Sequence, residues 1–303
     1  MMMENNDYLV TARAANDQIR AIAITSKSLV EEKRKLHNLS PIAGAAIGRL
    51  MSAALMMGDW LKNETDTLTI EIAGEGKLSH LTAVSNNKGE VRGYVSNPDV
   101  VLPPNASGHL NVGGAIGKGH MTIIRDLGLK MPYVSQLNLV SGEIAEDLTY
   151  YFAQSEQTPS AVGLGVHFDK ETVEVNHAGG FIIQLMPNTN EETIVRLEEN
   201  LKNIPSVTTM LEKNGDSPEK ILQEVLAGFD LVFEKKKDVR WKCNCNEERG
   251  ERILTSLTRK ELLEILDEGK PVEMNCSFCG KQYTYSLSEI RNILAKKGVV
   301  TNE

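Results

Sequence analysis

The chain has 303 residues, of which 41% are hydrophobic and 24% are charged, and its formal net charge at pH 7 is −8. Such a length and composition are typical of a globular protein with one large domain and smaller attached parts. The negative charge argues against nucleic-acid or anionic-membrane partners, because phosphate groups select for clusters of Lys and Arg. Residues 1–10, MMMENNDYLV, have no basic stretch followed by an apolar run, so we expect no signal peptide and a cytoplasmic protein.

The first 187 residues predict an α+β core domain. Alternating or nearly alternating apolar residues predict strands at 8–14, 18–25, 67–74, 78–85, 90–96, 120–127, 160–168, 172–179 and 180–187. Helices are predicted at 28–38 and within 139–157. For the second of these helices we expect Ser141 to begin the helix and Glu143 to lie in its first turn, where the helix dipole favours an acid.

Residues 40–61, SPIAGAAIGRLMSAALMMGDWL, predict a central helix. Ser40 fits an N-cap and Pro41 fits the first helical position. The segment is apolar on nearly all sides, so we expect it to be buried between layers of sheet. A membrane span needs about 20 predominantly apolar residues. Arg49 interrupts this stretch, so no membrane-spanning role is expected.

Residues 188–238 predict a helical, metastable linker. Two short apolar stripes occur at helical spacing, one formed by Ile194, Leu197 and Leu201 and the other by Ile221, Leu222, Val225 and Leu226. Isolated helices of this length are marginally stable. The linker should therefore be ordered only while it is docked on another surface. Residues 239–303 then form a compact C-terminal domain.

The C-terminal domain carries every cysteine of the chain, as Cys243-x-Cys245, thirty residues, and Cys276-x-x-Cys279. In an extended segment residues i and i+2 share a face, so the first pair can direct both sulfurs to one point. The second pair resembles a zinc knuckle, in which Gly280 permits the tight turn. No His follows His177. The simplest site is therefore one Zn²⁺ held by four thiolates.

Two other interpretations of the cysteines are open at this stage. A structural zinc ribbon for nucleic acid usually carries a basic face, whereas residues 240–303 contain 11 Lys or Arg and 10 Asp or Glu. A disulfide oxidoreductase would place its C-x-x-C in a βαβ setting, which this region lacks. The fate of zinc under oxidant separates the structural ribbon from a site that responds to oxidation. A disulfide oxidoreductase would require turnover of a dithiol substrate.

A zinc site of four thiolates also predicts sensitivity to oxidants. Thiolates are the form that oxidants attack, and each cysteine has a partner one or two residues away to form a disulfide. Metal binding supplies about 10–16 kcal/mol of apparent folding free energy in small zinc modules. Oxidation would release the metal and destabilise the domain, and the linker would loosen next. The sequence thus predicts a redox-triggered unfolding switch.

Several segments closely resemble the 33-kDa heat-shock protein family of redox-regulated holdase chaperones. In the tail these are CNCNEER and CSFCGKQYTY, and in the core domain SPIAGAAIGRLMSAALMMG, VRGYVSNP, DLGLKMPY, LVSGEIAEDLTYYFAQSEQTPSAVGLGV and AGGFIIQLMP. The resemblance covers nearly the whole chain. One departure is Asn246, where the family pattern has Ser after C-x-C, and it affects no expected ligand.

The resemblance implies a chaperone of oxidative and heat stress that is not an enzyme and uses no ATP. Its reduced form would hold Zn²⁺ through Cys243, Cys245, Cys276 and Cys279 and be inactive. Oxidation would form the disulfides Cys243–Cys245 and Cys276–Cys279, release zinc and unfold the tail and linker. The active form would bind unfolding client proteins and form a homodimer. The sequence does not assign the client-binding surface.

Overall fold

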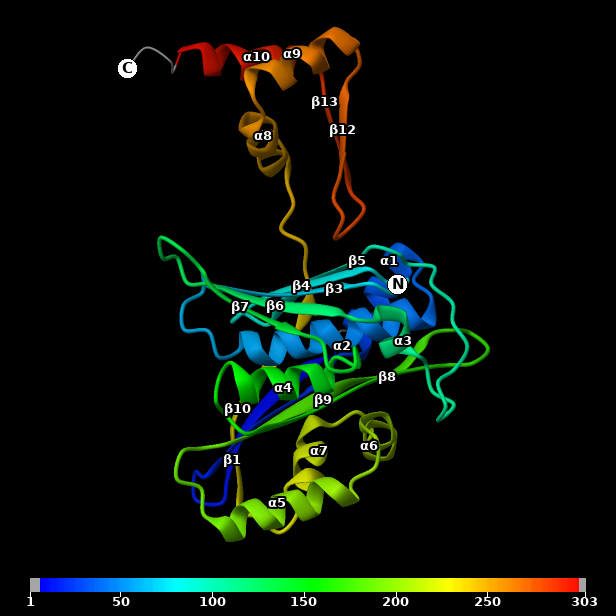
Figure 1. Cartoon of the computed structure of the whole chain (residues 1–303), viewed down its shortest axis with the longest axis vertical. Helices are drawn as coiled ribbons and strands as arrows, with labels where there is room; N and C mark the ends of the chain where they lie inside the picture. The colour runs from blue at the N-terminus through cyan, green and yellow to red at the C-terminus, as the bar shows by residue number, and fades with distance from the viewer. Residues whose placement is uncertain (1–5, 300–303) are drawn as a thin grey trace. The chain divides into compact units, whose positions relative to one another are not determined.

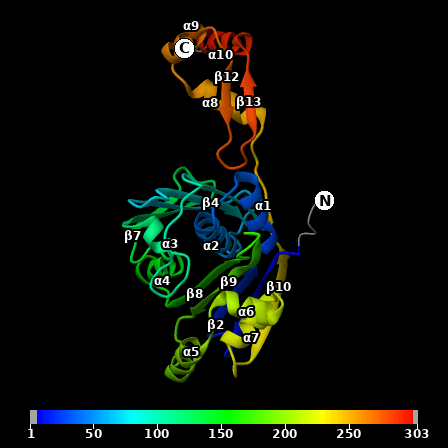
Figure 2. The ribbon, with the colours of Figure 1, turned by 90° about the vertical axis from the view of Figure 1, so that its right-hand side faces the viewer.

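A computed structural model of the chain describes residues 6–299. The chain forms two compact units, Met1–Lys242 and Cys243–Glu303 (Figures 1 and 2). The fold is α+β with a buried apolar helix, as the sequence predicts. The predicted linker, residues 188–238, lies within the first unit, and its separation from the core domain stays a prediction.

The first unit contains two sheets. One has the strand order β11-β5-β4-β3-β6-β7, with β3 Thr67–Gly74, β4 His80–Asn86, β5 Glu90–Val95, β6 Gly119–Asp126, β7 Tyr133–Asn138 and β11 Arg240–Trp241. The other has the order β10-β1-β2-β9-β8, with β1 Tyr8–Ala14, β2 Ile19–Thr25, β8 Ser160–Phe168, β9 Val175–Leu185 and β10 Leu231–Asp238. Neighbouring strands are antiparallel except β11 and β5, which are parallel.

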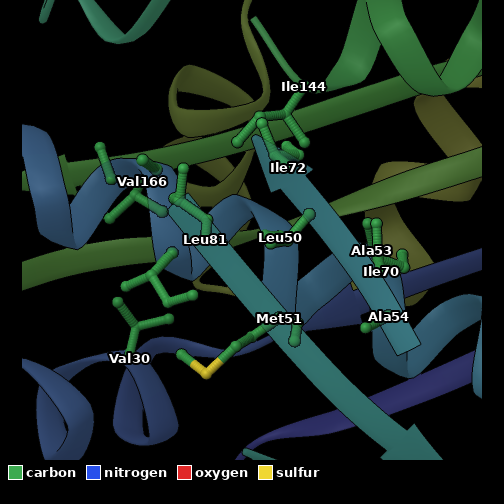
Figure 3. Close-up of a cluster of buried hydrophobic side chains, with 14 of the residues drawn as sticks. Val30, Leu50, Met51, Ala53, Ala54, Ile70, Ile72, Leu81, Ile144 and Val166 are labelled. Atoms are coloured by element: carbon green, nitrogen blue, oxygen red, sulfur yellow. The ribbon is translucent and has the colours of Figure 1, made fainter. Parts of the chain in front are cut away.

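Helix α2, Pro41–Gly58, lies between the two sheets and is the centre of the core (Figure 1). It begins as predicted, because Ser40 Oγ accepts a hydrogen bond from the N–H of Ala43 at 3.3 Å. The helix is long and apolar enough to cross a membrane by composition, but 89% of it is buried inside the protein. Figure 3 shows its side chains among those of β3, β4 and β8, so α2 is a core helix.

A glycine lets α2 approach its neighbours closely. A Cβ on Gly48 would lie 2.9 Å from a methyl carbon of Val30 and 3.0 Å from one of Val166. Val30 belongs to α1, Lys27–His37, and Val166 belongs to β8. Arg49 is the charged residue in the otherwise apolar sequence of α2, and it forms a 2.7 Å ion pair with Glu143 at the edge of the core.

The second predicted helix begins later than expected. Helix α4 spans Ala145–Gln154, so the prediction that Ser141 begins it and Glu143 lies in its first turn is wrong. The carboxylate of Asp147 accepts hydrogen bonds from the N–H groups of Val140, Ser141 and Ile144 at 2.7–3.1 Å. These bonds fold the residues before α4 into a loop rather than a helical turn.

One long strand replaces the two predicted at 172–179 and 180–187. Strand β9 runs straight through Gly179 and Gly180, because both glycines allow close approach of neighbouring strands. A Cβ on Gly179 would collide with the carbonyl oxygen of Ile24, and one on Gly180 with that of Gly163. The short helix α3, Val112–Ile116, and the strands β7, β10 and β11 are additional to the predicted elements.

Three helices of the predicted linker pack on the outer face of the five-stranded sheet: α5 Glu191–Asn203, α6 Val207–Asn214 and α7 Pro218–Val225 (Figure 1). Their apolar stripes form a second cluster with side chains of β1, β2 and β9. The last eight residues of this segment, Leu231–Asp238, form the edge strand β10 rather than a helix. The sequence predicts helical stripes only up to Leu226 and does not predict this strand.

The second unit is a hairpin with three helices. Strands β12 Val272–Asn275 and β13 Gln282–Tyr285 pair antiparallel, and the helices are α8 Glu247–Ser256, α9 Arg259–Glu268 and α10 Leu287–Val299. Among its described residues the buried side chains are Leu254, Leu262, Tyr283, Tyr285, Ile290 and Ile293. This is a small core for a unit of its length.

Candidate metal centre

Two chain segments supply the four cysteines. Cys243 and Cys245 lie on an extended segment before α8, and Cys276 and Cys279 lie in the turn between β12 and β13. The N–H of Gly280 donates to the carbonyl oxygen of Cys276 at 2.7 Å, and the N–H of Cys276 donates to that of Lys281 at 2.9 Å. Gly280 has a φ of 70°, which favours glycine. The turn is thus the knuckle that the sequence predicts.

The four sulfurs converge within 4.8 Å of one another. Sγ of Cys243 lies 3.6 Å from that of Cys276, and Sγ of Cys245 lies 3.3 Å from that of Cys279. A tetrahedral ion with metal–sulfur bonds of about 2.3 Å requires sulfur separations of about 3.8 Å. The four cysteines are not bonded to one another. The arrangement therefore fits one tetrahedral metal ion after small adjustments.

The donor set restricts the kind of metal. Four thiolates in a tetrahedron suit Zn²⁺ or iron, whereas Mg²⁺ and Ca²⁺ require oxygen ligands. Among the described residues this is the group of His, Cys, Asp and Glu side chains that is compact enough to hold a metal. The predicted residues are thus brought together, and their role as ligands stays a prediction.

The surroundings of the sulfurs shift the pKa values of three of the thiols in different directions. Burial raises the pKa of the Cys243 and Cys279 thiols. Burial also opposes ionisation of Cys245, but hydrogen bonds from Tyr283 and the neighbouring thiols lower its pKa to about 7. These surroundings therefore favour the thiolate form of Cys245 over those of Cys243 and Cys279 at neutral pH.

Tyr283 is a residue of the site that the sequence analysis missed. It lies on β13, and its hydroxyl donates a hydrogen bond to Sγ of Cys245 at 3.1 Å. Its neighbour on the same face, Tyr285, donates instead to the carbonyl oxygen of Glu247 at 2.8 Å. The Tyr-x-Tyr alternation predicts that both rings share a face, but no feature of the sequence indicates the contact with sulfur.

Known proteins of one family match nearly the whole chain. Residues 7–286 match the sequence model of the family described as Hsp33 protein. The chain belongs to the Hsp33 family. It is 47% identical over 291 residues to the 33 kDa chaperonin of Lachnoclostridium phytofermentans, covering 96% of this chain and 99% of that protein. It is also 47% identical over 288 residues to the 33 kDa chaperonin of Agathobacter rectalis, covering 95% and 99%.

A solved structure supports the Hsp33 assignment. The crystal structure of the 33 kDa chaperonin from Thermotoga maritima superposes with a TM-score of 0.87 at 36% sequence identity, covering 96% of this chain and 99% of that one. The resemblance inferred from the sequence is thereby confirmed, and so is the fold class. Membership of a chaperone family supports a chaperone role for this chain.

Proposed function

We propose that this Hsp33-family chain is a redox-regulated, ATP-independent holdase chaperone. Its reduced form holds one Zn²⁺ through Cys243, Cys245, Cys276 and Cys279 and is inactive. The observation that carries the proposal is the convergence of four sulfurs, from segments thirty residues apart, into a set that fits a tetrahedral ion. Bound zinc would keep the sulfurs as thiolates and crosslink the two segments.

Oxidation converts this site into disulfides. A cysteine thiolate attacks one oxygen of hydrogen peroxide, the O–O bond breaks and hydroxide leaves, giving a sulfenic acid. A second thiolate then attacks that sulfur, displaces its hydroxyl group as hydroxide and forms the disulfide. Forming each disulfide therefore transfers two electrons from a pair of thiolates to one peroxide. The family resemblance assigns the pairs as Cys243–Cys245 and Cys276–Cys279. Once paired, the sulfurs no longer bind zinc as thiolates, and the metal leaves.

Zinc loss destabilises the second unit because its own core is small. Six buried apolar residues form that core, whereas metal binding in small zinc modules supplies about 10–16 kcal/mol. Unfolding would then extend along the chain to β11 and β10, which precede Cys243 directly. These edge strands attach the C-terminal end of the linker and the residues after it to the rest of the first unit.

Release of the linker helices exposes apolar surface for clients. Their buried side chains include Leu197, Met210 and Leu222, and the sheet beneath contributes others such as Val10 and Phe181. Both faces become accessible when the helices leave, and large exposed apolar patches bind other apolar chains. The client-binding surface therefore includes the linker helices and the sheet face that they cover.

The remaining parts of the proposal follow the resemblance. The protein acts in the cytoplasm under oxidative and heat stress, its active oxidised form is a homodimer, and it catalyses no reaction. Its partners are unfolding proteins rather than nucleic acids or membranes, in agreement with the net charge of −8.

The deciding experiment follows zinc and a client together. Zinc release is read with a chromogenic chelator, and aggregation of a heat-unfolded client is read by light scattering, before and after peroxide at raised temperature. We expect about one zinc released per chain, with new suppression of aggregation that a thiol reductant reverses. Peptide mapping of the oxidised chain identifies the disulfide pairs. Zinc that stays bound, or leaves without a gain in client binding, would contradict the proposal and favour a structural ribbon.

A further inference from the structure

Tyr283 joins the core of the second unit to the sulfur cluster. Its ring is 7% exposed and packs in the small apolar core. Its hydroxyl reaches Sγ of Cys245 at 3.1 Å, a length suited to an O–H···S hydrogen bond. Because the buried ring fixes the hydroxyl, the donor stays directed at the sulfur while the unit is folded.

This donor differs from those at two other sulfurs. Sγ of Cys243 receives the backbone N–H of Cys245, and Sγ of Cys279 receives the backbone N–H of Lys281. The local backbone conformation places these N–H groups, so they do not depend on which side chain is present. The hydroxyl of Tyr283 is a side-chain donor 38 residues away in sequence, so it is present only because the residue is Tyr and not Phe.

A hydrogen bond to a thiolate slows its reaction with an oxidant. The donor withdraws electron density from the lone pairs that attack the peroxide oxygen, and nucleophilicity falls as the basicity of a thiolate falls. We propose that, while zinc holds Cys245 as a thiolate, the Tyr283 hydroxyl slows the oxidation of this sulfur and so sets how much oxidant the switch requires. This inference rests on the proposed redox function.

The expected size of the effect follows from two general magnitudes. Hydrogen bonds to charged groups contribute about 1.5–3 kcal/mol, and thiolate reactivity follows basicity with a coefficient of about 0.4–0.5. Losing the hydroxyl should therefore speed the reaction of this sulfur about 3- to 10-fold.

Tyr285 provides a matched control. It lies two residues along the same strand, its ring is 5% exposed in the same core, and its hydroxyl donates to the carbonyl oxygen of Glu247 at 2.8 Å. Tyr283→Phe and Tyr285→Phe each remove one hydroxyl and its hydrogen bond from this core. Only the first removes a hydrogen bond to sulfur, so the pair separates an effect on reactivity from an effect on stability.

The experiment uses the full-length reduced chain loaded with zinc, in wild-type, Y283F and Y285F forms. Zinc content is measured first. Peroxide is then added at a temperature at which all three are folded, and we follow zinc release together with loss of alkylatable thiol in the peptide that contains Cys245. Y283F should react about 3- to 10-fold faster than wild type, and Y285F should react at a rate close to wild type.

Three results would overturn the inference. Y283F could react at the wild-type rate, or Y285F could be accelerated as much as Y283F, which would assign the effect to stability. Y283F could also fail to hold zinc while Y285F holds it, which would make the hydroxyl necessary to build the site rather than to slow its oxidation. In each case the wild type still tests the proposed function separately, because a wild type that keeps its zinc under peroxide contradicts that function.

Discussion

Lys242, the residue directly before the first cysteine, places its Nζ 2.6 Å from Oε1 of Glu90 on β5. Nη2 of Arg240 binds the same carboxylate oxygen at 2.7 Å. The backbone of β11 is also attached, because the N–H of Arg240 donates to the carbonyl oxygen of Gly89 and the N–H of Lys242 to that of Val91. The side chain of Glu90 is 8% exposed. A single buried carboxylate thus anchors the end of the first unit.

Replacing this carboxylate should loosen β11. In Glu90→Gln both ion pairs are lost, at a cost of about 1–2 kcal/mol because the two cations are half exposed to solvent. Hydrogen–deuterium exchange of the amides of Arg240 and Lys242 should then be about 5- to 30-fold faster than in the wild type. Glu71→Gln, which changes an exposed carboxylate on β3, is the control. Equal exchange in E90Q and E71Q would exclude the anchoring role.

The same carboxylate predicts a pH dependence. Burial opposes its ionisation, but hydrogen bonds from Arg240, Lys242 and Asn86 lower the pKa of Glu90 from 4.5 to about 2. A carboxyl with a lower pKa in the folded chain stabilises the fold above its unfolded pKa and loses this contribution as the pH falls. The difference in urea stability between wild type and E90Q, read from tryptophan fluorescence, should therefore shrink as the pH falls from 4.5 toward 2. A difference that is constant over this range would contradict the assignment.

Gly250 should resist replacement by Ala, although Ala is favoured over Gly in a helix by about 1 kcal/mol. It lies in α8, and a Cβ there would collide with the hydroxyl of the buried Tyr285. We expect Gly250→Ala to destabilise the zinc-loaded second unit by about 1–3 kcal/mol, measured as weaker zinc binding in chelator competition. In a Y285F background the closest contact is removed and a ring carbon at 2.8 Å becomes the nearest atom, so the loss should be smaller. Equal losses in both backgrounds would show that the collision is not the cause.

The fold was predictable in segments where a pattern of neighbouring residues indicates a single structure. Helix α2 is apolar on all sides and begins at Ser40-Pro41, and both features are local. Strand β10 was not predicted, because Glu234 and the lysines after it suggest a solvated segment. The structure places these residues on an edge strand, where lysines are common because they discourage pairing with other chains.

The wrong predictions concern sequence patterns that occur in two different local structures. A Ser two residues before a Glu is found at helix starts. In this chain the N–H of Ser141 donates to Asp147 and the N–H of Glu143 donates to Oγ of Ser141, so both residues lie in a loop. Adjacent glycines such as Gly179-Gly180 usually end a strand, yet in β9 they admit neighbouring backbones. Long-range contacts decide between the alternatives, and they are not visible in a local pattern.

The candidate site was predictable in part for the same reason. The spacing of each cysteine pair is local, and two such pairs in one short segment indicate one centre, which agrees with the convergence of the sulfurs. The contact between Tyr283 and Cys245 spans 38 residues. It depends on how β13 packs on the cluster, so it required the structure.

Weakening the docking of the linker should activate the chaperone without oxidant. Leu222 on α7 is fully buried against the sheet, and Leu222→Ala should cost about 2–5 kcal/mol. The reduced, zinc-loaded variant should then suppress aggregation of a heat-unfolded client, as measured by light scattering. Val195→Ala on α5 is the control, because Val195 is 52% exposed. A reduced L222A as inactive as V195A would argue that linker docking does not mask the client-binding surface.

Removing one sulfur should unfold the second unit, loosen the linker and leave the rest of the first unit intact. In Cys276→Ser the remaining thiolates bind zinc more weakly, and the six-residue apolar core is too small to hold the unit without its metal. Ser277→Ala is the matched control, because Ser277 is exposed and adjacent in the same turn. Hydrogen–deuterium exchange should show lost protection in α8 to α10 of C276S, reduced protection in the linker helices and in β10 and β11, and retained protection in α2 and in β3 to β6. Adding a strong zinc chelator to the reduced wild type should reproduce the pattern. Protection that persists in α8 to α10 of C276S would mean that packing alone holds the unit, and zinc release would then not be sufficient to unfold it.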